Sequence, residues 1–100
     1  MNMQQMVQSM QKLQRQYEKE HKLLEEKEFS YTANGAIKLT LKGDMTFVNL
    51  EFIDKDILDK DNAEMVSDMI KLAYDHIKDE IGDAENEIAN KFKMPGGFGF

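Results

Sequence analysis

The apolar residues of this 100-residue chain change their spacing twice, and this limits the folds that are open to it. Up to about residue 27 they recur every three or four residues, which is the period of an amphipathic helix. From residue 28 to residue 53 they alternate, as in half-buried strands, and from about residue 62 the helical period returns. The pattern predicts an α+β fold with a long helix, a three-stranded antiparallel meander and a second long helix.

The first helix is predicted at about residues 2–27. Gln, Lys, Glu and Arg fill the positions between the apolar ones, and neither Gly nor Pro occurs before Gly35. Only Glu20 interrupts the heptad. The apolar positions, with Val7 beside them, are Met3, Met6, Met10, Leu13, Tyr17 and Leu24.

Two turn signals divide the alternating region into strands. Asn34-Gly35 is typical of a type I′ hairpin turn, whose two central residues need positive φ, and Gly43-Asp44 marks a second turn. In the third strand we expect Val48, Leu50 and Phe52 to share one face. The predicted strands are at about residues 28–33, 36–42 and 46–53.

The second helix is predicted at about residues 62–92, after an acidic, irregular segment that Ile57 and Leu58 anchor to the core. Pro95 and Gly96-Gly97 are expected to end the helix, so the domain spans residues 1–93 and residues 94–100 form a flexible tail. The apolar positions of this helix are Val66, Ile70, Ala73, Ile77, Ile81, Ala84 and Ile88.

The predicted helices are too long for a chain of this size to enclose. At a rise of 1.5 Å per residue each is roughly 40 Å long, whereas a compact 100-residue domain is roughly 35 Å across. Three strands also leave an apolar face and two open edges. We therefore expect a homodimer with a compact central body and paired helical arms.

The composition favours a binding protein of the bacterial cytosol. The chain has no cysteine, no apolar run long enough to cross a membrane and no secretory signal pattern. His21 and His76 lie on different helices, the acidic run from Asp54 to Glu64 lacks the spacing of a calcium loop, and no nucleophile–base pair is indicated. We predict no enzyme activity, metal, cofactor, membrane association or small-molecule substrate.

Charge is distributed unevenly along the chain, whose formal net charge is −6. Residues 1–22 carry four cations and two acids, whereas residues 63–91 carry three cations and eight acids. On a helix the four cations of the first segment fall within about 80° of one another, opposite the apolar positions. They could bind a phosphate backbone or form an ordinary solvated helix face. These residues are Lys12, Arg15, Lys19 and Lys22.

Several segments, taken together and in this order, resemble the YbaB/EbfC nucleoid-associated proteins. The resemblance covers almost the whole chain, and its strength lies in the combination of motifs. The motifs are Met3-Gln-Gln-Met6 with Met10-Gln-Lys-Leu13, Asn34-Gly35 before Ile37–Leu41, Val48–Ile53, Asp54–Leu58, Ala73-Tyr-Asp-His76 and Met94-Pro-Gly-Gly-Phe98.

The resemblance implies a tweezer-shaped cytoplasmic homodimer that binds double-stranded DNA between its helical arms. It also implies association with the nucleoid, a role in DNA compaction and gene expression, and no catalysis. Carried over to this chain, it makes Lys12, Arg15, Lys19 and Lys22 candidate contacts to the phosphate backbone. Because the last helix is acidic, Lys91 and Lys93 near its end are its best candidates.

A protein-binding adaptor is the alternative. In this interpretation the methionine-rich first helix grips apolar partners in the manner of a small chaperone, because flexible methionine surfaces adapt to varied partners. Binding to apolar partners persists at high salt, whereas binding to phosphates weakens. The salt dependence of binding therefore distinguishes the two functions.

Overall fold

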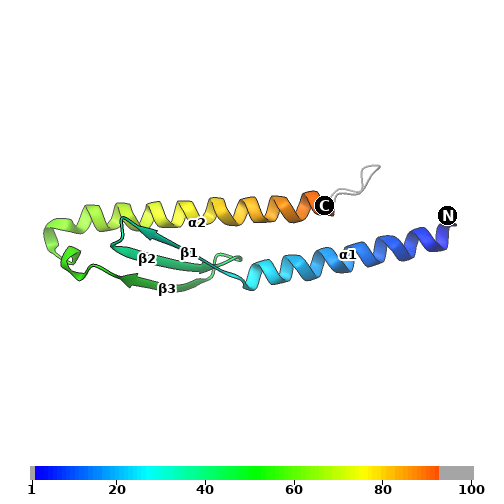
Figure 1. Cartoon of the computed structure of the whole chain (residues 1–100), viewed down its shortest axis with the longest axis horizontal. Coiled ribbons are helices and arrows are strands. Elements are labelled where there is room, and N and C mark those ends of the chain that lie inside the picture. The colour runs from blue at the N-terminus through cyan, green and yellow to red at the C-terminus, as the bar shows by residue number, and fades with distance from the viewer. Residues whose placement is uncertain (1, 93–100) are drawn as a thin grey trace.

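The computed structural model describes residues 2–92, and its element order is the one predicted (Figure 1). Lys93, the expected helix end at Pro95 and Gly96-Gly97, and the tail at residues 94–100 lie outside the described residues. The elements are α1 (Met3–Glu26), β1 (Glu28–Ala33), β2 (Ile37–Lys42), β3 (Phe47–Phe52), the short 3-10 turns Lys55–Ile57 and Lys60–Asn62, and α2 (Ala63–Lys91).

Helix α1 begins at a side-chain cap. The Asn2 Oδ1 atom accepts a hydrogen bond from the Gln5 backbone N–H at 2.8 Å, which satisfies one of the free donors of the first turn. The helix ends at Glu26, because Lys27 has extended backbone angles and leads directly into β1.

The strands form an antiparallel sheet in the order β1-β2-β3, as the meander predicts. Both central residues of the first turn have positive φ, 51° at Asn34 and 67° at Gly35. The Ala36 N–H donates to the Ala33 carbonyl oxygen at 2.9 Å and closes the turn. The type I′ geometry expected of Asn-Gly is confirmed.

Strand β3 contains an irregularity in its register with β2. Thr40 pairs with Asn49, but Leu41 pairs with Phe47, so Val48 is an extra residue in the register. The bulge places Phe47 rather than Val48 opposite Leu41, so the simple alternation on which the shared face of Val48, Leu50 and Phe52 was predicted is interrupted at Val48.

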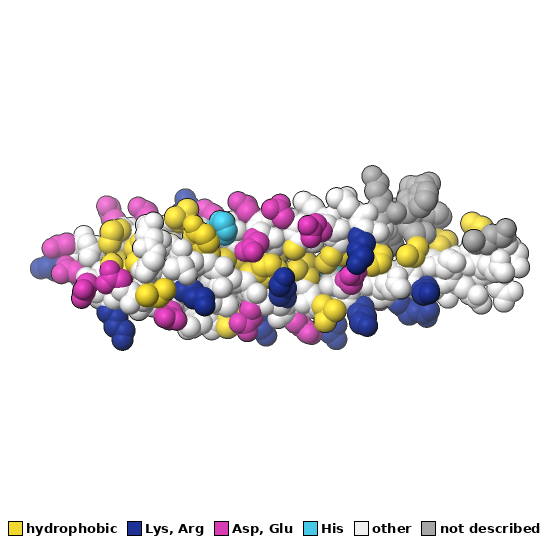
Figure 2. Space-filling view, viewed as in Figure 1, with side chains coloured by type: hydrophobic (Ala, Val, Ile, Leu, Met, Phe, Trp, Pro, Cys, Tyr) yellow, Lys and Arg dark blue, Asp and Glu magenta, His cyan; other side chains and the backbone are white. Residues whose placement is uncertain are grey.

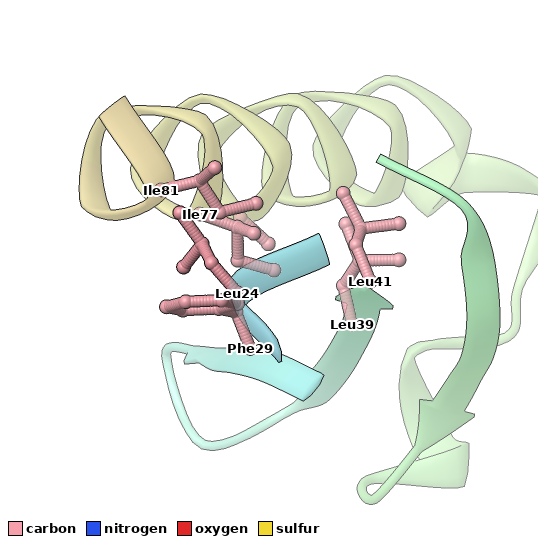
Figure 3. Packing of buried hydrophobic residues seen from close by; sticks show 7 residues of the cluster. Leu24, Phe29, Leu39, Leu41, Ile77 and Ile81 are labelled. Carbon is pink, nitrogen blue, oxygen red and sulfur yellow. The ribbon is translucent and has the colours of Figure 1, made fainter. Parts of the chain in front are cut away.

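Helix α2 packs across β1 and β2 and supplies much of the core. Its buried residues are Met69, Ala73, Ile77 and Ile81, one per turn. Figure 3 shows Ile77 and Ile81 facing Leu24, the only buried residue of α1. The rest of this cluster comes from the sheet and consists of Phe29, Leu39 and Leu41, with Ala73 of α2 beside them.

The segment between β3 and α2 is anchored by one residue rather than two. Ile57 is buried in a second cluster with Met69 and Ile37, as expected. Leu58 remains 58% exposed, so its predicted anchoring role is wrong.

The end of α1 is fixed to the turn between β2 and β3. The Gly43 N–H donates to the Lys27 carbonyl oxygen at 2.9 Å, and the Asp44 N–H donates to the Glu25 carbonyl oxygen at 3.2 Å. A Cβ atom at Gly43 would overlap the Leu24 backbone carbonyl, so only glycine permits this approach.

The chain is elongated, measuring 69 × 20 × 16 Å. Its radius of gyration is 19.7 Å, compared with about 13 Å for a compact chain of this length. Figure 1 shows the cause, because the N-terminal half of α1 extends past the end of α2 as an arm.

Candidate nucleic-acid interface

Four cations form a continuous row on the outer face of α1, which we call the basic row (Lys12, Arg15, Lys19 and Lys22). All four side chains are exposed. They are spaced three and four residues apart, so they follow one face of the helix for about 15 Å. In Figure 2, Lys and Arg side chains gather along the edge of the molecule formed by α1.

No carboxylate of the described residues forms an ion pair with a cation of the basic row. Between residues 2 and 92 the ion pairs are His21 Nδ1 to Glu25 Oε1 at 2.8 Å and Lys91 Nζ to Glu20 Oε1 at 2.7 Å. Neither pair includes a member of the basic row. The row can therefore neutralise phosphates without first breaking an ion pair.

Lys91, at the end of α2, is brought to the arm by its pairing with Glu20. A cavity of about 470 Å³ between the two helices is lined by Lys19, Glu20 and Lys91. The structure thus brings one residue of the basic row and one candidate from the last helix to the same cavity, while Lys93 lies outside the described residues. In the sequence Glu20 is visible only as a break in the heptad. Its pairing with Lys91, 71 residues away, was not predicted.

The outward surface of α2 has the opposite charge. Residues 63–91 carry eight acids and three cations. Figure 2 shows Asp and Glu side chains along the α2 edge. Such a surface repels a phosphate backbone. Within the described residues, the two long helices therefore present faces of opposite sign.

A second surface is apolar and lies beside β3, where α2 does not cover the sheet. Phe47 is 62% exposed, although it stands opposite the buried Leu41. This groove has a volume of about 520 Å³. It could not be predicted from the sequence, because the direction of the Phe47 side chain depends on the bulge in β3. The groove is lined by Leu39, Leu41, Met45, Phe47, Leu50, Ser67, Ile70, Lys71 and Tyr74.

Other kinds of site find no support in the part of the chain that the structure describes. Residues 2–92 bring together no group of three or more His, Asp or Glu side chains able to hold a metal ion. Neither α1 nor α2 contains a stretch apolar enough to cross a membrane.

Comparison with known proteins identifies the family of this chain. A profile of the YbaB/EbfC DNA-binding family matches residues 1–97. A nucleoid-associated protein of Malacoplasma penetrans is 32% identical, over 95% of this chain and 99% of its own. Those of Clostridium novyi (33%; 98% and 90%) and Streptococcus sanguinis (34%; 95% and 98%) are similarly close. The chain belongs to the YbaB/EbfC DNA-binding family.

Proposed function

We propose that this protein binds double-stranded DNA as a homodimer, with the basic row of each α1 arm against a phosphate backbone. The observation that carries the proposal is the row itself. It consists of four exposed cations, on an arm that projects from the body, that form no ion pair with another described residue. Membership of a DNA-binding family supports it. The function is binding alone, with no catalytic step.

The length of the basic row suits one DNA strand. From Lys12 to Lys22 the helix rises about 15 Å, and one strand of duplex carries a phosphate about every 3.4 Å along the axis. Four cations therefore meet about four phosphates. Because these contacts are made to DNA phosphates and not to bases, they give affinity without sequence preference.

Lys91 extends this surface at the base of the arm. Lys91 lies across the cavity from Lys19, so a phosphate bound there would replace Glu20 as its partner. Loss of the Lys91–Glu20 ion pair offsets part of the free energy gained from the new phosphate contact. We therefore expect Lys91 to contribute less to DNA affinity than a residue of the basic row. Lys93 adds a cation two residues later in the sequence.

The apolar groove beside β3 is the surface we propose for the dimer. Helix α2 covers β1 and β2, which leaves the inner side of β3 and an open strand edge to solvent. Pairing two such surfaces buries Phe47 and Tyr74 and joins the bodies, while both arms remain free. A tweezer-like dimer follows from this arrangement.

The relatives are named as nucleoid-associated proteins, and we extend that association to this chain. It places the protein on cytoplasmic DNA, where a dimer with two basic arms could hold two stretches of duplex close together. Compaction and altered gene expression would be consequences of that contact.

Binding to a mixed-sequence duplex of about 30 base pairs, measured by fluorescence anisotropy from low salt to about 0.3 M, tests the proposal. Changing all four residues of the basic row to Gln is expected to lower affinity at least about 100-fold and to flatten the salt slope. The matched control changes Lys38, Lys55, Lys60 and Lys78 to Gln, because it alters net charge equally at exposed positions off the arm and outside the groove beside β3. Equal losses in the two variants would refute the assignment of the row.

The adaptor alternative keeps one observation in its favour, the exposed apolar residues Met3, Met6 and Val7 on the arm. If the wild type fails to bind duplex even at low salt, and binds an apolar peptide with an affinity independent of salt, the adaptor function replaces DNA binding.

A further inference from the structure

The projecting half of α1 carries an apolar stripe on the side opposite the basic row. We call it the arm stripe (Met3, Met6, Val7, Met10 and Leu13). Met3 is 80% exposed, Met6 51% and Val7 46%. Apart from Val7, these residues follow a strict 3-4 spacing that continues through Tyr17 and Leu24. So narrow a stripe is typical of the seam of a coiled coil, whereas a helix that packs on a sheet has a wider apolar face.

The other half of the same seam shows which kind of partner it takes. Leu24 shares a buried cluster with Ile77 of α2, and the Tyr17 ring lies edge-on to the Phe92 ring at a centroid distance of 6.0 Å. Helix α2 runs antiparallel to α1 and ends just before Phe92, while α1 continues past it (Figure 1). The seam therefore extends beyond α2, and an antiparallel helix in line with α2 would continue the same packing.

The arm carries no charge that would oppose a second copy of itself. Residues 2–11 contain no charged side chain, although the whole chain has a formal net charge of −6. Like charges beside the seam destabilise a coiled coil, and here the flanking positions are Val7, Ser9, Gln14 and Gln16. Two arms can therefore meet along this face without repulsion, while the basic row of each points away from the contact.

An antiparallel pair of arms also fits the length of the stripe. When Met6 of one arm lies beside Met10 of the other, Met3 lies beside Leu13, and the two stripes overlap for about 15 Å. The overlap stops before Tyr17, where Phe92 already occupies the seam. A parallel pair would bring both bodies to the same end, where two α2 helices would compete for the space between the arms.

We propose that the arm stripe of each chain packs antiparallel against the arm stripe of a chain in another dimer. The contact is a two-stranded coiled coil about two heptads long, with the helix axes about 8–10 Å apart. Short helices of this length are marginal in water, so the contact is weak between dilute dimers. It becomes stronger when several dimers are held on one DNA molecule, because their arms are then at a high effective concentration.

The paired arms present two basic rows that face in opposite directions. Each row lies opposite its own stripe, so each can contact a separate duplex. The contact between arms thus holds two duplexes side by side. This bridging rests on the DNA binding proposed above, whereas the contact between arms does not.

Disulfide trapping between chains tests the contact in the absence of DNA, because the natural chain has no cysteine. Concentrated Met6→Cys and Met10→Cys proteins are mixed and oxidised, and mass spectrometry identifies the links. We expect the 6–10 link to form at least about tenfold faster than a link between two Gln8→Cys chains, which are the matched control. Gln8 is exposed at the centre of the overlap but lies about 180° around the helix from the seam.

A 6–10 link no faster than the Gln8→Cys link would overturn the proposal. So would a faster link between two Met6→Cys chains, since that is the product of a parallel pair. A 6–10 link that forms in a protein unable to bind duplex would instead refute the proposed DNA binding and leave the contact between arms standing.

Charge reversal at Val7 tests the bridging and leaves the basic row intact. Two Val7 side chains meet across the antiparallel pair, so Val7→Lys and Val7→Glu each place like charges together, and a mixture of the two variants places opposite charges together. Capture of a fluorescent duplex on beads that carry a second duplex should fall at least about tenfold in each variant alone and recover in the mixture. Bridging that persists in both variants alone, or that fails to recover in the mixture, would contradict the proposal.

Discussion

The two long helices follow the same sequence pattern but differ in what covers them. Helix α2 buries Met69, Ala73, Ile77 and Ile81 against the sheet, whereas α1 buries only Leu24. The difference follows from position, since the sheet lies alongside α2 but only beside the last turn of α1 (Figure 1). An amphipathic pattern thus predicts a helix, but the arrangement of the other elements decides which part of its apolar face enters the core.

The solvent faces of the two helices differ as well. Helix α1 carries the basic row, and α2 carries an excess of acids. Helix α2 therefore stabilises the body, while most of α1 projects from it and carries the surface that we propose for DNA. The following substitutions separate these two roles.

The largest expected effect on stability is in the core under α2. Ile77 is fully buried, so Ile77→Ala removes packing that cannot be replaced and should lower the free energy of unfolding by about 3 kcal/mol. Met6→Ala on the exposed half of α1 should change it by less than about 0.5 kcal/mol. Urea denaturation followed by circular dichroism measures both, and similar losses would show that the arm is part of the core.

A smaller loss is expected where the arm joins the body. Gly43→Ala places a methyl group against the Leu24 carbonyl, so either α1 or the β2–β3 turn must move. We expect a loss of about 1–3 kcal/mol in the free energy of unfolding. Gly82→Ala is the control, because its Cβ meets no atom and a helix favours alanine. If both variants keep wild-type stability, the close approach at Gly43 is absent in solution.

The pairing of Glu20 with Lys91 should limit DNA affinity rather than hold the fold. Both side chains are partly exposed, so Glu20→Gln should change the free energy of unfolding by less than about 0.5 kcal/mol. It frees Lys91 for phosphate, so DNA affinity at low salt should rise about two- to fivefold. Glu18→Gln makes the same change in charge at an exposed position on α1. An equal rise in that variant would mean that net charge, not the pairing, sets the effect.

The smallest effect concerns Asp44, beside the junction of α1 with the sheet. Hydrogen bonds from the Thr46 side chain and backbone hold the pKa of the Asp44 carboxyl below its ordinary value of 3.8. The contribution of the Asp44 carboxylate to the stability of the folded state is therefore fully present above pH 3.8. It is lost as the pH falls through the lowered pKa. Thermal melting between pH 7 and pH 3 should show a small advantage of the wild type over Asp44→Asn that is constant at neutral pH and decreases toward the acidic end. A difference independent of pH would contradict this role.

The sequence predicted those features that depend on neighbouring residues. Asn34-Gly35 sets its own turn because both positions tolerate positive φ, and the alternation around it defines β1 and β2. The exposure of Lys12, Arg15, Lys19 and Lys22 also follows from their placement on one helix face. Their contact with DNA remains a prediction.

Features that depend on distant contacts could not be predicted. The bulge at Val48 arises from the register between β2 and β3, and it turns Phe47 into the groove. The partner of Glu20 lies on another helix, and only the position of α2 over the sheet brings Lys91 to it. Neither contact leaves a signal in the spacing of residues along the chain.

The central claim is that DNA contacts α1 through its basic row and leaves the acidic face of α2 free. Backbone amide NMR shifts, followed while a duplex of about 30 base pairs is added at low salt, test it directly. The account predicts that the largest changes fall between residues 12 and 22 and near Lys91, with little change along the acidic face from Asp75 to Glu87. Changes concentrated on α2, or spread evenly over the protein, would contradict it.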